Sequence, residues 1–363
     1  MMIGLLGGGQ LGRMLALAGV SLGLRFRAFD HNPDAPVGNV AELMVAEFDD
    51  LKAIELFADG LDLVTYEFEN IPVESVRFLN ERVPVFPPPD ALDWGQDRLL
   101  EKSFFQRLEI PTARFSAVRS SHDLERAVGE IGLPAMLKTR RLGYDGKGQF
   151  LLRTPEDLSQ AWNSIGNPAL ILESFVPFER EVSILAVRAR TAETVFYPLV
   201  ENHHDGGILR LTLAPAPGLS MELQTVAQDY ATRVLEALDY VGVLAIEFFV
   251  FDGQLYANEF APRVHNSGHW SIEGAETSQF ENHLRAILGL PLGSTAAIGY
   301  SAMINLIGTL PDPQVVLAMQ DAHLHLYDKA PRPGRKLGHI TIRRADPQSR
   351  ELGVIQIHNL LRG

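Results

Sequence analysis

Cysteine is missing altogether from this 363-residue sequence. Its absence excludes a disulfide-stapled fold, thiol catalysis, and any zinc or iron–sulfur site that cysteine would ligate. Tryptophan is also scarce, with three residues, but apolar residues make up 46% and charged residues 21%, close to the globular average. This composition excludes a chain that is disordered as a whole, and the length predicts two or three domains.

Positive charge is in short supply. The sequence has 32 Lys and Arg against 45 Asp and Glu, a formal net charge of −13. General nucleic-acid binding needs a basic surface and is therefore excluded. The charge is uneven, because residues 1–95 carry a net −9 and residues 323–363 a net +5. The basic tail indicates either a site for an anion such as a substrate phosphate, or a solvated surface.

Little in the sequence would direct it to a membrane. The apolar N-terminus lacks a basic region and a small-residue cleavage site. The longest uncharged run, residues 286–311, could span a bilayer by length, but it contains two prolines and four glycines. We interpret it as a helix end, a loop and a buried strand, and expect a soluble, cytoplasmic protein without a membrane partner.

The first quarter of the chain alternates strands and helices. Apolar strands are predicted at 2–6, 25–29, 61–66 and 83–86, with one helix following the glycine motif at 7–12 and running through residue 22, and another at 73–80. This βαβ pattern predicts a mostly parallel sheet with helices on both faces. Three successive prolines at 87–89 then mark a boundary.

The rest of the chain mixes helices with more numerous strands. Helices are predicted at 98–108, 121–131, from 154, 222–238 and 278–288, and strands at 135–139, 149–152, 169–175, 181–190, 194–201, 208–214, 243–250 and 254–260. For residues 302–362 the pattern predicts a small antiparallel β unit with one helix, at 312–319.

A first glycine motif, GGGQLG at 7–12, follows a strand and precedes a helix, and Asp30 ends the next strand. This is the setting of a dinucleotide-binding turn, so an NAD-dependent oxidoreductase is one hypothesis. The alternative is that the glycines merely permit a tight turn and close helix packing.

A second glycine-rich segment, GYDGKGQ at 143–149, follows a strand that contains Lys138. Its backbone N–H groups could wrap phosphate oxygens, and Lys147 at its tip would add charge. It is not a Walker A loop, because no Ser or Thr follows the lysine. The alternative is a plain hairpin loop between two strands.

Two glutamates interrupt a strongly apolar hairpin. Glu247 lies in one strand and Glu259 in the returning strand, with the turn near Asp252 and Gly253. A strict two-residue turn would pair Glu247 with Asn258, whereas a loop with an odd number of residues would set the two glutamates opposite each other. Facing carboxylates repel unless a cation lies between them, and oxygen-only ligands predict Mg²⁺. The alternative is that one glutamate faces solvent.

Five segments taken together resemble the ATP-grasp superfamily over essentially the whole chain, and within it the N5-carboxyaminoimidazole ribonucleotide synthetases of purine biosynthesis. They are GGGQLGRM at 7–14, TYEFENI at 65–71, GYDGKGQ at 143–149, NEFAPRVHNSGH at 258–269 and DKAPRPGRKLGH at 328–339. The resemblance implies an α/β and α+β multidomain ATP-grasp fold. Its expected parts are a Rossmann-like parallel-sheet domain at 1–95, a small domain with the glycine-rich lid at 96–175, a large Mg²⁺/ATP domain at 176–300 and a C-terminal β-rich extension at 301–363.

The resemblance also implies a reaction. ATP would phosphorylate bicarbonate to carboxyphosphate, and the amine of 5-aminoimidazole ribonucleotide would capture the carboxyl group, releasing ADP and phosphate. Such a ligase uses one or two Mg²⁺ ions with ATP as co-substrate, no NAD and no biotin, and is expected to be a homodimer. Rival hypotheses are a formate-dependent glycinamide ribonucleotide transformylase of the same superfamily, and a non-catalytic nucleotide-binding regulator.

The resemblance assigns roles to residues that match its motifs. The ATP contacts would be Arg98, Lys138, Gly143, Tyr144, Asp145, Gly146, Lys147, Gly148, Gln149, Glu173, Val176, Glu181, His204, Asn258 and Glu259. The ribonucleotide contacts would be Gln10, Leu11, Glu67, His265, Asn266, Ser267, Lys329, Arg335 and Lys336. Glu247 and Glu259 would hold Mg²⁺, and the catalytic set would be Arg263, Tyr144, Asp145 and Lys147.

One departure concerns the metal. Many ATP-grasp enzymes carry Glu-x-Asn at the second metal position, but here Ala261 follows Glu259 and Phe260. The third ligand is missing, which leaves the number and geometry of the Mg²⁺ ions open.

Overall fold

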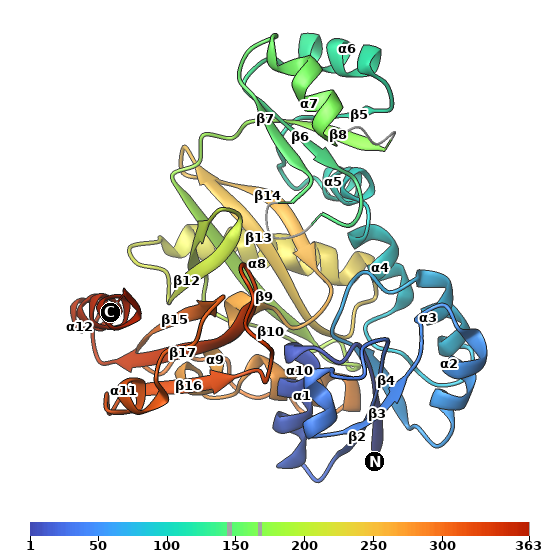
Figure 1. Ribbon diagram of the computed structural model, residues 1–363, viewed down its shortest axis with the longest axis vertical. Helices are drawn as coiled ribbons and strands as arrows, with labels where there is room; N and C mark the ends of the chain where they lie inside the picture. Colours follow the sequence, from blue (N-terminus) through green and yellow to red (C-terminus); the bar gives the residue numbers. More distant parts are fainter. Residues whose placement is uncertain (144–146, 166–168, 363) are drawn as a thin grey trace.

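The computed structural model describes residues 1–143, 147–165 and 169–362. Their strands form three separate sheets, two of four strands and one of nine. In Figure 1 the two small sheets lie in the upper and lower right parts of the molecule, and the large sheet lies between them and extends to the C-terminal helix.

The N-terminal sheet is wholly parallel, as predicted, with the strand order β3-β2-β1-β4. Its strands are β1 (Met2–Leu6), β2 (Arg25–Asp30), β3 (Glu42–Val45) and β4 (Leu63–Tyr66). The accompanying helices are α1 (Gln10–Val20), a 3₁₀ turn (Pro36–Asn39), α2 (Leu51–Ala58), α3 (Val73–Asn80) and α4 (Pro89–Gly95). Neither β3 nor α2 was predicted, and the strand expected at 83–86 was wrong, because that segment makes one isolated bridge between Val64 and Val85.

The second small sheet is antiparallel, in the order β5-β8-β6-β7. Its strands are β5 (Phe115–Val118), β6 (Ala135–Thr139), β7 (Gln149–Leu152) and β8 (Leu170–Ser174), and its helices are α6 (Ser121–Ile131) and α7 (Asp157–Ile165). Helix α5 (Arg98–Arg107) connects it to the N-terminal part. The apolar faces of α6 and α7 close a small core with Val118, Leu137 and Leu172.

The large sheet runs in the order β14-β13-β9-β11-β12-β15-β17-β16, with β10 beside β9. Its strands are β9 (Arg180–Arg188), β10 (Thr194–Phe196), β11 (Val200–Asp205), β12 (Ile208–Ala214), β13 (Gly242–Phe251), β14 (Gln254–Ala261), β15 (Tyr300–Ile307), β16 (Ala322–Leu326) and β17 (Lys336–Arg344). The helices that follow or cover them are α8 (Met221–Ala237), a 3₁₀ turn (Asn266–Gly268), α9 (Ser271–Gly274), α10 (Gln279–Leu288), α11 (Pro313–Leu317) and α12 (Pro347–Arg362). The strand expected at 194–201 is split between β10 and β11.

The C-terminal strands continue this sheet rather than forming a unit of their own, because β15 pairs with β12. The prediction of a single helix there was wrong, since α12 is a second one. Its buried face consists of Arg350, Gly353, Val354 and Ile357, while Leu352 is 63% exposed. An arginine and a glycine on the buried face hide the helical apolar pattern from the sequence.

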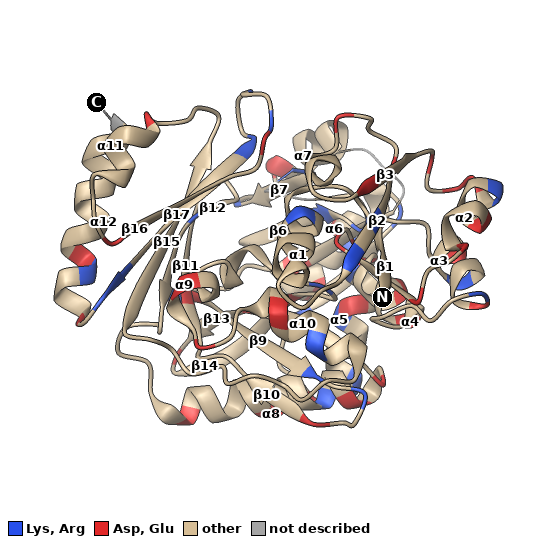
Figure 2. Cartoon of the chain, turned by 90° about the horizontal axis from the view of Figure 1, so that it is seen from below, with Lys and Arg blue, Asp and Glu red and all other residues tan. Residues whose placement is uncertain are grey.

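The uncharged run at 286–311 folds as interpreted. Helix α10 ends within it at Leu288, and β15 begins at Tyr300. Among the described residues, no helix has the length and apolar character needed to cross a membrane. The acidic residues of the N-terminal part include several on α2, α3 and the adjoining loops, which are red in Figure 2.

Candidate active site

A cavity of about 550 Å³ lies where the three sheets meet. The N-terminal part contributes Gln10 and Leu11, the small antiparallel sheet contributes Lys138 and Glu173, and the large sheet contributes further charged residues. The predicted residues that line it are Gln10, Leu11, Arg98, Lys138, Gly143, Gln149, Glu173, Val176, Glu181, His204, Glu247, Asn258, Glu259, Arg263, His265, Asn266 and Lys336. Residues predicted for ATP, for the ribonucleotide and for a metal thus share one space.

The two hairpin glutamates face each other, but by neither of the routes considered from the sequence. The β13–β14 turn is a strict two-residue turn, because Phe251 pairs with Gln254. Asn258 is an extra residue in β14, and this β-bulge shifts the register so that Glu247 lies opposite Glu259.

Helix α5 is hydrogen-bonded to β14 on both sides of that bulge. The Glu101 carboxylate accepts a hydrogen bond from the N–H of Phe260 at 2.7 Å, and Lys102 Nζ donates to the carbonyl of Ala257 at 3.1 Å. Both side chains are buried. Neither residue was predicted, although Glu101 and Lys102 share a helix face with Phe105, and charge on an apolar face is a signal that the sequence contains.

The two facing carboxylates differ in pKa, because different charges lie next to each of them. Burial alone would raise the pKa of Glu259, but Arg98, which donates to it at 2.9 Å, lowers that pKa to about 2. Burial and the neighbouring Glu259 charge raise the pKa of Glu247 to about 7. The site therefore holds one firmly ionised carboxylate and a second that a cation would help to ionise.

The donor set fits a hard divalent cation only with help from a ligand. Two glutamates supply carboxylate oxygens, the type that Mg²⁺ prefers. Among the described residues, no group of three or more His, Cys, Asp or Glu side chains could hold a metal ion by itself. An ion bound here would take its remaining ligands from water and phosphate oxygens.

The cavity wall formed by β6 and β8 carries a buried charge network. Lys138 Nζ lies 2.9 Å from Glu173, and Lys102 Nζ lies 3.7 Å from the same carboxylate. Burial would raise the pKa of Glu173, but these two lysines lower it to about 2. Glu181 pairs with His204 at 3.0 Å. Phe178 and Phe249, which no motif singled out, stack at 4.6 Å and add an apolar wall.

The backbone N–H groups of the first glycine motif donate hydrogen bonds to carboxylates of the chain itself. Glu67 accepts hydrogen bonds from the N–H groups of Gly9 at 2.7 Å and of Leu11 and Gly12 at 3.1 Å. A Cβ on Gly9 would lie 2.6 Å from the Glu67 carboxylate. Asp30 accepts from the N–H of Gly8 at 2.6 Å. The amides that would contact the pyrophosphate of a dinucleotide are thus bound by Glu67, and the acid that would bind its ribose is hydrogen-bonded to Gly8.

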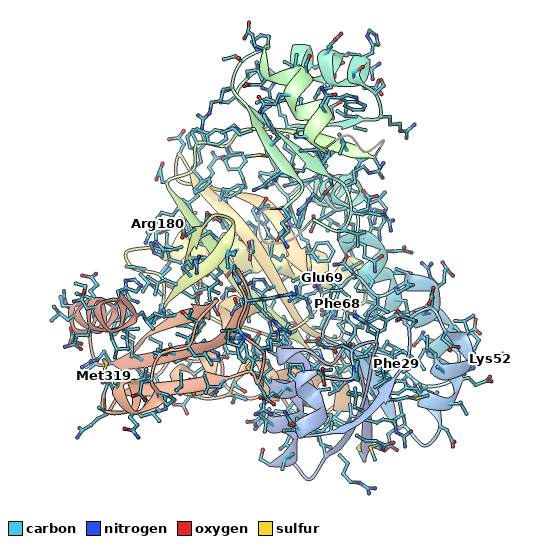
Figure 3. All side chains as sticks on the ribbon, viewed as in Figure 1. Phe29, Lys52, Phe68, Glu69, Arg180 and Met319 are labelled. Atoms are coloured by element: carbon cyan, nitrogen blue, oxygen red, sulfur yellow. The ribbon has the colours of Figure 1, made fainter. Side chains whose placement is uncertain are left out.

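The segment after β14 brings the predicted substrate residues into the cavity. Arg263 is paired with the carboxylate of Glu69. Figure 3 labels Glu69, which lies where the N-terminal part faces the large sheet. His265 Nε2 lies 3.3 Å from Glu247, and burial lowers the pKa of His265 to about 3. The side-chain amides of Asn266 and Asn305 bind each other at 2.8 and 3.1 Å.

The cations of the basic tail make different contacts, although Arg335, Lys336 and Arg332 lie near enough to Lys329 to help lower its pKa. Lys336 lines the cavity, where its charge acts on Glu247 and His265. Lys329 donates to the side chain of Gln10, and burial lowers its pKa to about 8. Arg335 donates to the carbonyl of Ala330 at 3.1 Å.

Some predicted residues lie outside the cavity lining. Of those that the structure describes, they are Glu67, Lys147, Gly148, Ser267, Lys329 and Arg335. Tyr144, Asp145 and Gly146 lie outside the described residues, so their predicted closure over the reacting centre stays a prediction.

Three family models match the chain. Residues 1–96 match the ribonucleotide synthetase preATP-grasp domain, residues 103–280 the ATP-grasp domain, and residues 301–351 the phosphoribosylaminoimidazole carboxylase C-terminal domain. The domain boundaries expected at 95, 175 and 300 remain a prediction, and the last of them falls within the continuous large sheet.

Whole-chain relatives agree with these models. An N5-carboxyaminoimidazole ribonucleotide synthase of Pseudomonas aeruginosa is 55% identical over 361 residues, which cover 99% of each chain. The crystal structure of an N5-carboxyaminoimidazole ribonucleotide synthetase from Thermus thermophilus matches with a TM-score of 0.96 and 61% identity over 99% of this chain and 98% of that one. A synthase from Aspergillus clavatus in complex with ADP and 5-aminoimidazole ribonucleotide matches with a TM-score of 0.93 and 30% identity over 99% and 98%.

Proposed function

Because this chain belongs to the N5-carboxyaminoimidazole ribonucleotide synthase family of ATP-grasp ligases, which carboxylate 5-aminoimidazole ribonucleotide at the expense of ATP, we propose how its own residues do so. The observation that carries the proposal is the single cavity that unites Lys138 and Glu173 with Glu247, Glu259 and His265. Neither a dinucleotide nor a plain hairpin loop accounts for that convergence.

ATP lies with its phosphates between Lys138 and the two facing glutamates. The loop at 143–149 covers the phosphates, Glu173 and Val176 border the adenine, and Glu181 takes the ribose hydroxyls. Glu247 and Glu259 would hold Mg²⁺, which would neutralise phosphate charge and polarise the transferred group. Arg98 keeps Glu259 ionised for that task, through their 2.9 Å ion pair.

Bicarbonate is the first acceptor. Its oxygen attacks the γ-phosphorus of ATP, so that ADP leaves and carboxyphosphate forms. Arg263 is suited to hold the carboxylate, since its guanidinium already binds the Glu69 carboxylate in this structure. Carboxyphosphate hydrolyses readily, so a lid at 143–149 that excludes water serves the reaction.

The amine of the ribonucleotide completes the reaction. It attacks the carbonyl carbon of carboxyphosphate, phosphate leaves, and the nitrogen gives up a proton as the carbamate forms. Gln10, His265 and Asn266 border the substrate, while Lys329 and Lys336 hold its 5′-phosphate. That phosphate does not react, so its binding energy positions the amine.

Phosphate release from ATP tests this function directly. Bicarbonate, formate, 5-aminoimidazole ribonucleotide and glycinamide ribonucleotide are supplied singly and in pairs. We expect full release only with bicarbonate and 5-aminoimidazole ribonucleotide together, and a formate-dependent rate with glycinamide ribonucleotide would contradict the proposal. That the enzyme is a cytoplasmic homodimer stays a prediction; sedimentation of the purified chain tests its oligomeric state.

A further inference from the structure

A buried row of polar side chains crosses the large sheet beneath the cavity. Thr212 on β12, Asn202 on β11 and Ser183 on β9 come from neighbouring strands and are 0%, 4% and 0% exposed. Thr212 pairs directly with Asn202, and Ser183 pairs directly with Glu247 on β13. Cross-strand partners share a face, so these side chains lie on the face of the sheet that carries Glu247.

These side chains form an unbroken hydrogen-bond chain that leads to His265. Thr212 Oγ1 donates to Asn202 Oδ1 at 3.0 Å, and Asn202 Nδ2 donates to Ser183 Oγ at 2.9 Å. Ser183 Oγ donates to Ser267 Oγ at 2.7 Å, and Ser267 Oγ lies 2.9 Å from His265 Nδ1. The other ring nitrogen of His265 lies 3.3 Å from Glu247 Oε1, which returns the chain to the sheet beside Ser183.

The chain has one consistent direction. The amide of Asn202 can donate only from nitrogen, so Ser183 Oγ accepts its hydrogen bond and donates its own hydroxyl hydrogen to Ser267 Oγ. The backbone N–H of Ser267 also points at His265 Nδ1, at 3.3 Å. The backbone contact requires Nδ1 to be an acceptor, so the hydroxyl of Ser267 donates to Nδ1 as well, and an imidazole that accepts at Nδ1 carries its one N–H proton on Nε2.

We propose that Asn202 and Ser183 are positioning residues that, through Ser267, hold His265 in the Nε2–H tautomer, with that N–H turned toward Glu247 Oε1 at 3.3 Å. One oxygen of Glu247 then faces His265, and the second is the one that a cation takes. Ser267 acts from below His265 rather than on the substrate. The inference rests on the proposed function only for its catalytic consequence, because the tautomer is a property of the unliganded protein.

The first experiment is imidazole ¹⁵N NMR of the wild-type protein labelled with ¹⁵N-histidine, without ligands, with the His265 signals assigned by their loss in His265→Gln. We expect the proton on Nε2 and a bare Nδ1. A proton on Nδ1, or on both nitrogens, overturns the proposal. This result does not depend on any substrate, so it is separable from a failure of the proposed reaction.

The second experiment compares two variants that each lose one buried hydroxyl bound to a buried group. Ser183→Ala interrupts the chain, and we expect a mixture of His265 tautomers and a fall in kcat of about 10- to 100-fold, the scale for partners that orient metal ligands. The KM for ATP should change little. The matched control is Thr65→Val, which removes a hydroxyl bound to His283 at 2.8 Å, away from the cavity.

Thr65→Val should lower the melting temperature as Ser183→Ala does, with the wild-type His265 spectrum and kcat retained. Equal losses of kcat in the two variants, or an unchanged His265 spectrum in Ser183→Ala, would contradict the positioning role. If Ser183→Ala does not fold, the wild-type spectrum alone decides the tautomer.

Discussion

Two glycine-rich loops follow strands in this chain, and their surroundings are opposite. The loop at 7–12 presents its amides to Glu67, a side chain of the same N-terminal part, which closes the start of helix α1. At the other loop, its end residues Gly143 and Gln149 line the same cavity as Glu247 and Glu259. One loop binds an anion that the chain itself supplies, and the other borders the cavity in which the charged residues converge.

The comparison shows what glycine spacing means physically. Such spacing leaves backbone N–H groups unpaired at a strand–helix turn, and a negative group is then favourable there. Whether that group is a carboxylate of the protein or a phosphate of a ligand depends on residues distant in sequence. Glu67 lies 55 to 58 residues from the amides it binds.

The largest effect should come from a change in the cavity that the second loop borders. Glu259→Gln removes one of the two facing carboxylates, and with it the partner of Arg98, so the cavity should bind Mg²⁺·ATP poorly. We expect ATP turnover to fall by about 100-fold or more, with the fold intact by circular dichroism. Near-normal phosphate release at low millimolar Mg²⁺ would show that the metal assignment is wrong.

A change at the first loop, at 7–12, should lower the stability of the protein. Glu67→Ala leaves three amide donors of α1 without their carboxylate, and we expect a loss of about 3 kcal/mol or more in the free energy of unfolding, measured in urea. Glu74→Gln, an exposed glutamate of the same part, is the matched control and should change it by less than about 0.5 kcal/mol. A Glu67 variant that kept its stability but lost ribonucleotide affinity would restore the substrate role first predicted for it.

The basic tail tests whether a third anion site exists. Lys329→Met and Lys336→Met should each lower kcat/KM for the ribonucleotide by about 1.5–3 kcal/mol, the scale of a charged hydrogen bond. Lys329→Met should leave the KM for ATP unchanged, because Lys329 lies beside Gln10 rather than the glutamates. Arg332→Met, on the exposed part of the same loop, is the control. An unchanged kcat/KM for the ribonucleotide would mark the tail as a solvated surface, and a loss confined to ATP would assign the lysines to the ATP site.

The pH dependence of stability tests a second difference: the Glu67 carboxylate is hydrogen-bonded by the first loop, whereas the Glu247 carboxylate in the cavity faces the charge of Glu259. Burial and Glu259 raise the pKa of Glu247 to about 7 in the folded state, above its unfolded value. The folded state therefore binds more protons between pH 4.5 and 7, and ionising Glu247 costs stability that is fully lost above pH 7. Without ligands, Glu247→Gln should stabilise the protein by about 1–3 kcal/mol at pH 8 and by much less at pH 5. Destabilisation at pH 8 would count against the repulsion.

The smallest expected effect is that of NADH, which should not change the fluorescence of the protein. With Glu67 and Asp30 bound to the first loop, NADH should leave the fluorescence of the three tryptophans unchanged, while Mg²⁺·ATP should alter it. A saturable change with NADH would break the comparison, because it would show that the first loop still accepts a dinucleotide.

Local patterns account for most elements that the sequence predicted. Helices α3 and α6 and strands β6, β7 and β12 appear with the expected boundaries. Their periodicity and caps involve neighbours within a few residues, such as Ser120, whose hydroxyl accepts from the N–H of Asp123 in the first turn of α6. Helix α12 was not predicted, because Arg350 and Gly353 stand where its buried face would otherwise show apolar residues.

By itself the sequence determined the residue types of the site and the family, since five motifs in order survive in the linear chain. The tertiary structure alone decided how those residues meet. Glu101 and Lys102 hold the bulge at Asn258 from a helix about 155 residues away, and that bulge sets Glu247 against Glu259. A one-residue shift of register reverses the face of every side chain, so only a contact across the fold could bring the two carboxylates together.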